Sequence, residues 1–191
     1  MDTPPIENAE GIDGSPEGKV YTWPVVIGVI SIVLSSLGLV CGGCAAGMLA
    51  VLPSILKDQG ELPPTMSLSG PMLVHMGLGL LNAIVLLVGG ILLIRRNPTA
   101  RMLHLVYAIT GLPLVAFGVW VQFNQMAAMD QWVAENPNSP FAQGHSSAGG
   151  MIGMAVGVVL GGGWPVFLLI WFGVIKNKAD SMGVRPAPPP V

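Results

Sequence analysis

Long uncharged stretches alternate with short charged segments along this chain. The uncharged runs cover residues 20–56, 62–94, 102–129 and 136–175. Each run contains an apolar stretch of about 20 residues, which is the length that a helix needs to span a bilayer. The pattern therefore predicts four membrane-spanning helices, over residues 24–52, 71–94, 99–123 and 148–175.

The two ends of the chain have a different composition. Residues 1–22 are acidic and rich in proline and glycine, and residues 176–191 are rich in proline. Segments of this kind bury too little apolar surface to fold, so we expect both tails to be disordered. The sequence thus predicts an all-α protein: an integral membrane four-helix bundle over residues 23–175, with disordered N- and C-terminal tails.

Two connections between the predicted spans have their own signals. Asn97 precedes Pro98 and is suited to cap the third span, which predicts a tight hairpin after Arg96. Apolar residues recur at helical spacing from Met126 to Val133, so we expect the third span to continue as an amphipathic turn that lies on the membrane surface.

The composition supports the membrane interpretation. The chain is 52% hydrophobic and 9% charged, against about 25% charged in ordinary soluble domains. The net charge is −2 and no basic block is present, so we expect the lipid bilayer and not a nucleic acid as partner. The segment before the first span has Lys19 as its only basic residue, which is atypical of a secretory leader.

The basic residues are distributed unevenly between the two sides of the predicted bundle. Four spans place both tails and the 95–101 hairpin on one side. That side has seven of the eight basic residues and the other side has only Lys57. Basic residues are enriched on the cytoplasmic side, so we expect both termini to be cytoplasmic.

Small residues form two smooth faces. The first span has a seam at alternating steps of three and four, which includes Gly28, Ser31, Ser35, Gly38 and Gly42. The last span has a ladder of glycines at steps of four: Gly149, Gly153, Gly157 and Gly161. Such faces let two helices approach closely in lipid. We expect the first and last spans to lie side by side with the ladder covered inside the monomer, and a homo-oligomer or other membrane subunits remain open alternatives.

Two polar residues are expected near the centre of the membrane, Asn82 on the second span and Thr110 on the third. Pro113 has no N–H for the carbonyl of Ile109. We predict a hydrogen bond from Asn82 to Thr110 or to that carbonyl, with a structural role.

A metal or thiol redox site is a further hypothesis. Cys41 and Cys44 form a C-x-x-C pair in the outer third of the first span, at the depth where His75, His145 and eight of the eleven methionines are also expected. Thiolate and thioether ligands select Cu(I). The alternative, which we favour, is that both cysteines are small packing residues beside the glycine seam.

The sequence gives no indication of an enzyme or of a bound cofactor. It has no Ser-His-Asp set, phosphate-binding loop or pair of carboxylates. The spans lack charged residues apart from Arg101 at the end of the third, which is atypical of pumps and coupled transporters. His75 and His104 are expected near opposite ends of their spans, too far apart to hold one haem.

The opening of the first span, Trp23 to Ile32 followed by Gly38 to Cys44, resembles that of small, uncharacterised four-span bacterial membrane proteins of the planctomycete type. The likeness covers about a fifth of the chain. It implies a bacterial inner-membrane location and no known activity. The outer loops lack the cysteines that claudins and tetraspanins use, so the chain does not resemble those families.

These observations lead to three functional hypotheses. The first is a multi-pass scaffold or accessory subunit that acts through helix packing. The second is a channel or carrier for a small neutral solute, lined by the Gly, Ser and Asn faces. The third is the outward-facing metal or thiol redox site. A channel predicts that the small faces meet around a continuous lumen, whereas a scaffold predicts that helix contacts close them.

Overall fold

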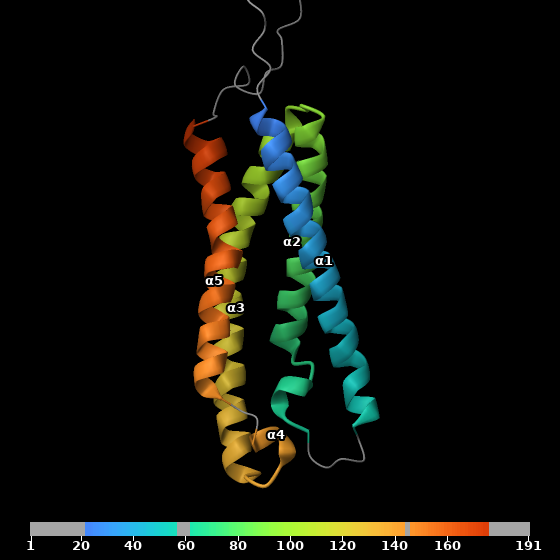
Figure 1. Ribbon diagram of the computed structural model, residues 1–191, viewed down its shortest axis with the longest axis vertical. Helices are drawn as coiled ribbons and strands as arrows, with labels where there is room; N and C mark the ends of the chain where they lie inside the picture. The colour runs from blue at the N-terminus through green and yellow to red at the C-terminus, as the bar shows by residue number, and fades with distance from the viewer. Residues whose placement is uncertain (1–21, 57–61, 144–145, 176–191) are drawn as a thin grey trace, which may run out of the picture.

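The computed structural model describes residues 22–56, 62–143 and 146–175, and these contain helices and no strand. The long helices run side by side in an elongated bundle (Figure 1). They are α1 (Trp23–Ile55), α2 (Gly70–Ile94), α3 (Thr99–Glu135) and α5 (Ser147–Ile170). The shorter elements are the 3-10 turn η2 (Pro64–Met66), α4 (Pro140–Gln143) and the π-helical turn η3 (Trp171–Ile175) that continues α5.

The four long helices are each long and apolar enough to cross a membrane, α5 together with η3. The prediction of an all-α, multi-pass membrane bundle is confirmed. The predicted starts and ends are close for α2, and α1 extends three residues beyond its predicted end, across Pro53. The two tails lie almost wholly outside the described residues, so their predicted disorder stays a prediction.

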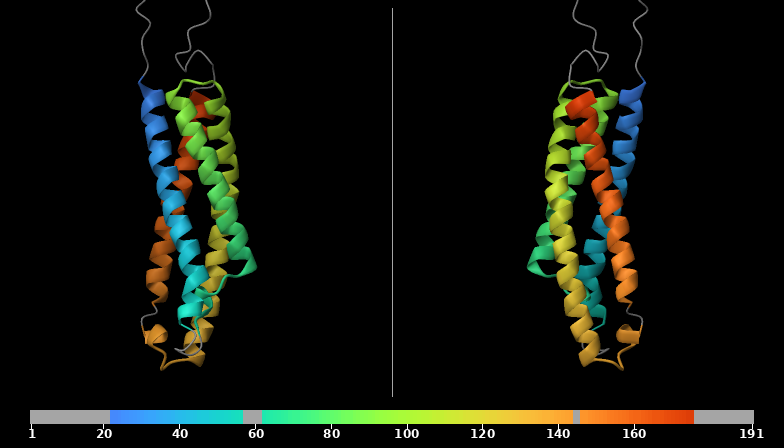
Figure 2. Two further views of the ribbon diagram at one scale, coloured as in Figure 1. Left: turned by 90° about the vertical axis from the view of Figure 1, so that its right-hand side faces the viewer. Right: turned by 90° about the vertical axis from the view of Figure 1, so that its left-hand side faces the viewer.

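The third span is much longer than predicted. At about 1.5 Å per residue, the 37 residues of α3 cover about 55 Å, well beyond the ~30 Å hydrocarbon core. The helix continues through Glu135 as one rod along the bundle axis (Figures 1 and 2). The expectation that residues after Phe123 turn to lie flat on the membrane surface is therefore wrong; they continue the span along the bundle axis, where Gln125 contacts Met72 of α2 and Met126 contacts Gly150 of α5.

The α2–α3 connection is a tight hairpin, as predicted. Arg96 has φ 55°, and its N–H donates to the carbonyl of Leu93 while the N–H of Asn97 donates to that of Leu92. This is the pattern of a Schellman C-cap. Asn97 Oδ1 then accepts from the backbone N–H of Thr99 at 2.9 Å, which fulfils its predicted capping role.

The two ends of the bundle differ in the elements that they contain. The hairpin end contains the α2–α3 hairpin, the start of α1 and the end of η3, and the loop end contains η2 and α4 (Figures 1 and 2). Neighbours in the chain pack together: α1 on α2, α2 on α3, and α3 on α5. The last span meets α1 mainly through aromatic rings at the hairpin end, where Trp23 lies 5.8 Å from Trp171 and 6.0 Å from Phe172.

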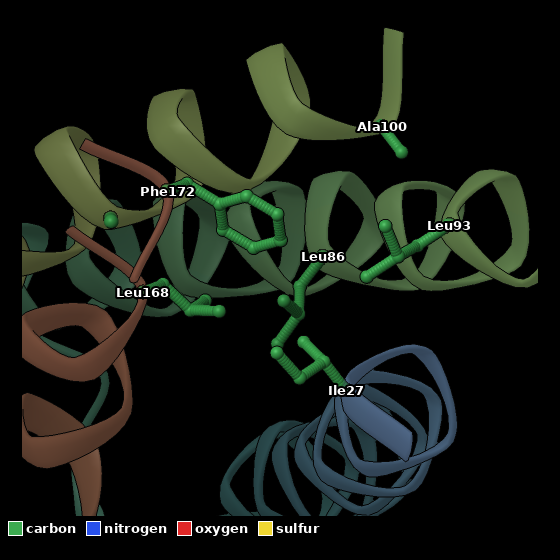
Figure 3. Packing of buried hydrophobic residues seen from close by; sticks show 7 residues of the cluster. Ile27, Leu86, Leu93, Ala100, Leu168 and Phe172 are labelled. Atoms are coloured by element: carbon green, nitrogen blue, oxygen red, sulfur yellow. The ribbon is translucent and has the colours of Figure 1, made fainter. Parts of the chain in front are cut away.

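The main core lies in the half of the bundle next to the hairpin end. Side chains from all four long helices and from η3 meet there (Figure 3). The buried members are Ile27, Leu86, Leu93, Ala100, Ala108, Leu168 and Phe172. In the other half, the described residues form only a small buried cluster of Met129, Trp132 and Ala142, where α4 folds against the end of α3. The two halves of the bundle therefore differ in packing.

Candidate functional site

Polar side chains and glycines face each other along the contact between α2 and α3, which we call the polar–glycine seam. Each polar side chain lies where a Cβ on the opposite glycine would be in close contact. The three pairs are His75 with Gly118 (2.5 Å to Nε2), Asn82 with Gly111 (3.3 Å to Nδ2) and His104 with Gly89 (3.2 Å to Nδ1). Successive pairs are seven residues apart on both helices, in opposite directions, as antiparallel helices with a heptad contact require.

The pair nearest the hairpin end is completely buried. His104 is 0% exposed, and its Nδ1 lies 2.7 Å from the carbonyl oxygen of Ala100. Because a carbonyl only accepts, Nδ1 donates, and the hydroxyl of Ser31 on α1 donates to Nε2 of the neutral ring at 3.1 Å. The ring also packs against Phe172 at 5.0 Å. His104 thus connects α1, α3 and η3 while Gly89 makes room for it on α2.

In the half of the bundle next to the hairpin end, the small residues of α1 are in close contact with α2. A Cβ on Gly28 would lie 2.9 Å from the carbonyl oxygen of Gly90, and a Cβ on Gly90 would lie 2.9 Å from that of Gly28. Ser31 and Ser35 are buried beside this crossing. Gly38 has no atom within 4 Å of an added Cβ, and Gly42 makes only an ordinary contact with Leu80 at 3.4 Å. The predicted seam is therefore a close crossing in its first half only, and its partner is α2.

The central pair contains the predicted hydrogen bond. The hydroxyl of Thr110 donates to Asn82 Oδ1 at 2.8 Å. The Asn82 amide reaches the carbonyl oxygen of Tyr107 at 3.5 Å, and not that of Ile109. The Thr110 hydroxyl also lies 2.8 Å from the carbonyl oxygen of Val106, one turn earlier in its own helix. Asn82 and Thr110 thus link α2 to α3 as expected, with a different backbone carbonyl as the second partner.

The pair nearest the loop end lies beside a crevice that is lined by α2, α3 and α5 and, in its smaller part, also by α1. His75 makes no hydrogen bond to any described residue, and its ring packs against Phe117 at 5.9 Å. Two adjoining cavities of about 450 Å³ and 240 Å³ share His75, Val115 and Gly161 in their walls. The larger cavity extends toward the loop end along α5, and the smaller one reaches Asn82 and Tyr107. We refer to the two together as the crevice.

The glycine ladder of α5 lies at this crevice and is not covered by α1. Gly153 and Gly157 have no atom within 4 Å of an added Cβ. The nearest atoms to Gly149 belong to its own N-cap residue Ser146, and Gly161 contacts only Val115 of α3, at 3.7 Å. The expectation that the ladder packs against the first span inside the monomer is wrong, because α1 uses its small residues against α2 and diverges from α5 toward the loop end.

The described residues that were proposed for a metal site do not form a cluster. Cys41 and Cys44 are both exposed on α1. Among the described residues there is no group of three or more His, Cys, Asp or Glu side chains that could hold a metal ion. His145 lies outside the described residues, so a site that includes it stays a prediction without structural support.

Several residues of the seam and crevice were not identified from the sequence. His75 and Asn82 on α2 were singled out from the sequence, but the residues of α3 that face them were not. The missed residues are Tyr107, Gly111 and Gly118. The short hairpin fixes which residues face each other, so pairing α2 with α3 outward from Arg95 would have placed a glycine opposite each polar residue.

Comparison of the chain with protein-family models, with curated proteins and with solved structures gives no match. The resemblance of the first span to small four-span bacterial membrane proteins therefore stays a prediction, and the function has to be argued from the geometry of this chain.

Proposed function

We propose that this protein is a membrane scaffold or accessory subunit that assembles through helix packing, with a second copy of the chain seated on the glycine ladder of α5. The observation that carries the proposal is the open space over Gly153 and Gly157, where an added Cβ would meet no atom within 4 Å. Glycine weakens a helix relative to alanine, by up to about 1 kcal/mol per residue. A row of glycines that contacts nothing therefore has a cost that a packed partner would offset.

The position of α5 supports a second copy as the partner. Along the membrane α5 packs on α3, and its residues from Gly149 to Gly163 are mostly exposed. An edge helix with a smooth ridge is complementary to itself, since two-fold symmetry places the same surface on both sides of the contact. Ridges with small residues at steps of four are typical of close helix dimers in lipid, which are held by van der Waals packing.

The Gly28–Gly90 crossing provides a comparison within the same chain. Where small residues of α1 and α2 do meet, the backbones approach until a Cβ would touch the opposite carbonyl at 2.9 Å. The free part of the ladder, Gly149 to Gly157, has the same composition and no such partner. Contact with a second α5 would give it the close approach that the first seam already has.

The channel alternative has less support. It predicts small polar faces around a continuous lumen, but the small residues of α1 near the hairpin end are in contact with α2. Leu86, Leu93, His104 and Phe172 are 0–2% exposed across the same level of the bundle. The crevice therefore ends against packed side chains.

The proposal includes a location. We place the protein in a bacterial inner membrane with both termini in the cytoplasm. The support is the distribution of basic residues, seven of eight on the side of the hairpin, together with the resemblance of the first span.

The test is the mass of the purified protein in mild detergent and in lipid nanodiscs. We expect two copies for the natural chain and one copy for the double variant Gly153→Leu, Gly157→Leu. The matched control is Gly43→Leu, Gly47→Leu on α1, because these glycines also have no atom within 4 Å of an added Cβ. A monomeric natural chain contradicts the proposal, as does a dimer that the α1 control dissociates and the ladder variant does not.

A further inference from the structure

The floor of the crevice has polar groups without partners inside an otherwise apolar cavity. The smaller cavity of about 240 Å³ is lined by His75, Asn82, Tyr107 and Ser35, together with aliphatic side chains, a proline and glycines. The Tyr107 hydroxyl and both ring nitrogens of His75 make no hydrogen bond to any described residue. Polar atoms at membrane depth are costly when they lack a partner, because hydrocarbon offers none.

Two glycines of α3 leave room for the side chains of His75 and Asn82. A Cβ on Gly118 would lie 2.5 Å from His75 Nε2, and a Cβ on Gly111 would lie 3.3 Å from Asn82 Nδ2. With side chains at these positions, His75 and Asn82 would be displaced from α3. Since α3 also contributes Tyr107 and α1 contributes Ser35, four hydrogen-bonding side chains line the smaller cavity.

The rest of the crevice is suited to an apolar chain. The larger cavity of about 450 Å³ is lined by Val115 and Val119 of α3 and by Met154 and Val158 of α5, with Gln122 as a further polar residue. Apart from His75, neither cavity has an acidic or basic residue in its walls. Cavities of this size, mostly apolar and with a few polar groups placed together, are typical of small-molecule sites.

We propose that the crevice binds a neutral, membrane-soluble molecule that has a carbonyl or hydroxyl oxygen at one end and an apolar tail. The oxygen lies at Tyr107, Asn82 and His75, where the tyrosine hydroxyl and the asparagine amide donate to it. The tail follows Val115, Val119 and Met154 toward the loop end. Gly153 and Gly157 also line the larger cavity, so the tail lies next to the dimer contact proposed for the ladder. The polar end, at Tyr107 and His75 on α3 and α2, lies outside that contact, and the variants below therefore test the site separately from the dimer.

The experiment measures binding of a radiolabelled decyl-substituted benzoquinone to the full chain in lipid nanodiscs, with empty nanodiscs as background. Unlabelled quinone and decylbenzene serve as competitors, because they share the tail and differ in the oxygens. We expect saturable binding of one molecule per chain that the unlabelled quinone displaces and decylbenzene does not.

Three variants locate the site. Tyr107→Phe removes one donor and should weaken binding about fivefold, the effect of one hydrogen bond. His75→Leu should weaken it by a similar factor. Thr99→Val is the matched control: it removes a hydroxyl from the start of the same helix at a residue that lines neither cavity, so the affinity should stay unchanged. Thermal unfolding of each variant checks that it is folded.

Three results would overturn the proposal. The first is the absence of saturable binding above empty nanodiscs; a crevice filled with water would give this result. The second is equal competition by decylbenzene, which would leave only an unselective apolar groove. The third is unchanged affinity in both Tyr107→Phe and His75→Leu, which would place the quinone elsewhere on the protein.

Discussion

The hydroxyl of Ser31 on α1 lies 3.1 Å from Nε2 of His104 on α3, across the space that Gly89 leaves on α2. Both side chains are fully buried. The bond therefore connects two helices that are not neighbours in the chain, and it does so next to the core at the hairpin end. It adds a polar link to the half of the bundle that contains the main buried core.

The Ser31–His104 bond should contribute measurably to stability. Ser31→Ala leaves the histidine nitrogen without a partner, so we expect a loss of about 1 kcal/mol in the free energy of unfolding. Ser35→Ala is the control, because the Ser35 hydroxyl donates only to carbonyls of its own helix, Ser31 at 2.7 Å and Ile32 at 3.0 Å. Reversible unfolding in mixed detergent measures both variants. Equal effects of the two changes would mean that the interhelical bond has no special role.

The α1–α2 crossing should tolerate no side chain at Gly90. A Cβ there would lie 2.9 Å from the carbonyl oxygen of Gly28 and 3.1 Å from Ser31 Cβ, and the backbone carbonyl is part of a packed helix. We expect Gly90→Ala to destabilise the protein by about 1–3 kcal/mol. Gly77→Ala on the same helix has no atom within 4 Å and should be neutral or slightly stabilising. If Gly90→Ala unfolds like Gly77→Ala, α1 and α2 are not in close contact.

The Asn82–Thr110 pair lends itself to a double-mutant cycle. The single variants Asn82→Leu and Thr110→Val and the double variant together give the coupling energy of the 2.8 Å bond. Bonds of this kind in membranes average about 0.6 kcal/mol, so we expect a coupling of that size. A coupling indistinguishable from zero, or no change in melting temperature for Asn82→Leu, would show that the bond has no structural weight.

The orientation in the membrane can be tested with single cysteines in a Cys41→Ala, Cys44→Ala background. Ser139→Cys lies next to α4 at the loop end, and Thr99→Cys begins α3 at the hairpin end. Because basic residues are concentrated at the hairpin end, a membrane-impermeant thiol reagent added to intact cells should label residue 139 and leave residue 99 unlabelled. The reverse labelling would contradict a cytoplasmic location of the termini.

The sequence was sufficient to identify the four spans, the hairpin cap at Asn97 and the bond between Asn82 and Thr110. These features depend on local composition or on the depth of single polar residues, and one chain contains that information. The extent of α3 was harder to predict, since polar residues after Asn124 are compatible both with a surface helix and with a span that continues out of the membrane.

The pairing of smooth helix faces could not be predicted in the same way. Small residues show where a close approach is allowed, and they do not specify the helix that makes it. Gly28 has its partner in Gly90 of α2, whereas Gly153 and Gly157 have none within the chain. The polar–glycine seam between α2 and α3 could have been predicted, because the short hairpin sets the register that places Gly118 opposite His75.

The most direct test of the proposed assembly is a cysteine scan from Gly149 to Gly161 along α5, in the same cysteine-free background and in native membranes. A disulfide needs Cα atoms about 4.4–6.8 Å apart, so only residues at a close helix crossing can react between two copies. We expect cross-linked dimers at residues 149, 153 and 157, and none at Ile152 or Val159, which are 67% and 70% exposed on other faces of the helix. Cross-linking that is absent throughout, or that is strongest at Ile152 or Val159, would contradict the proposed assembly.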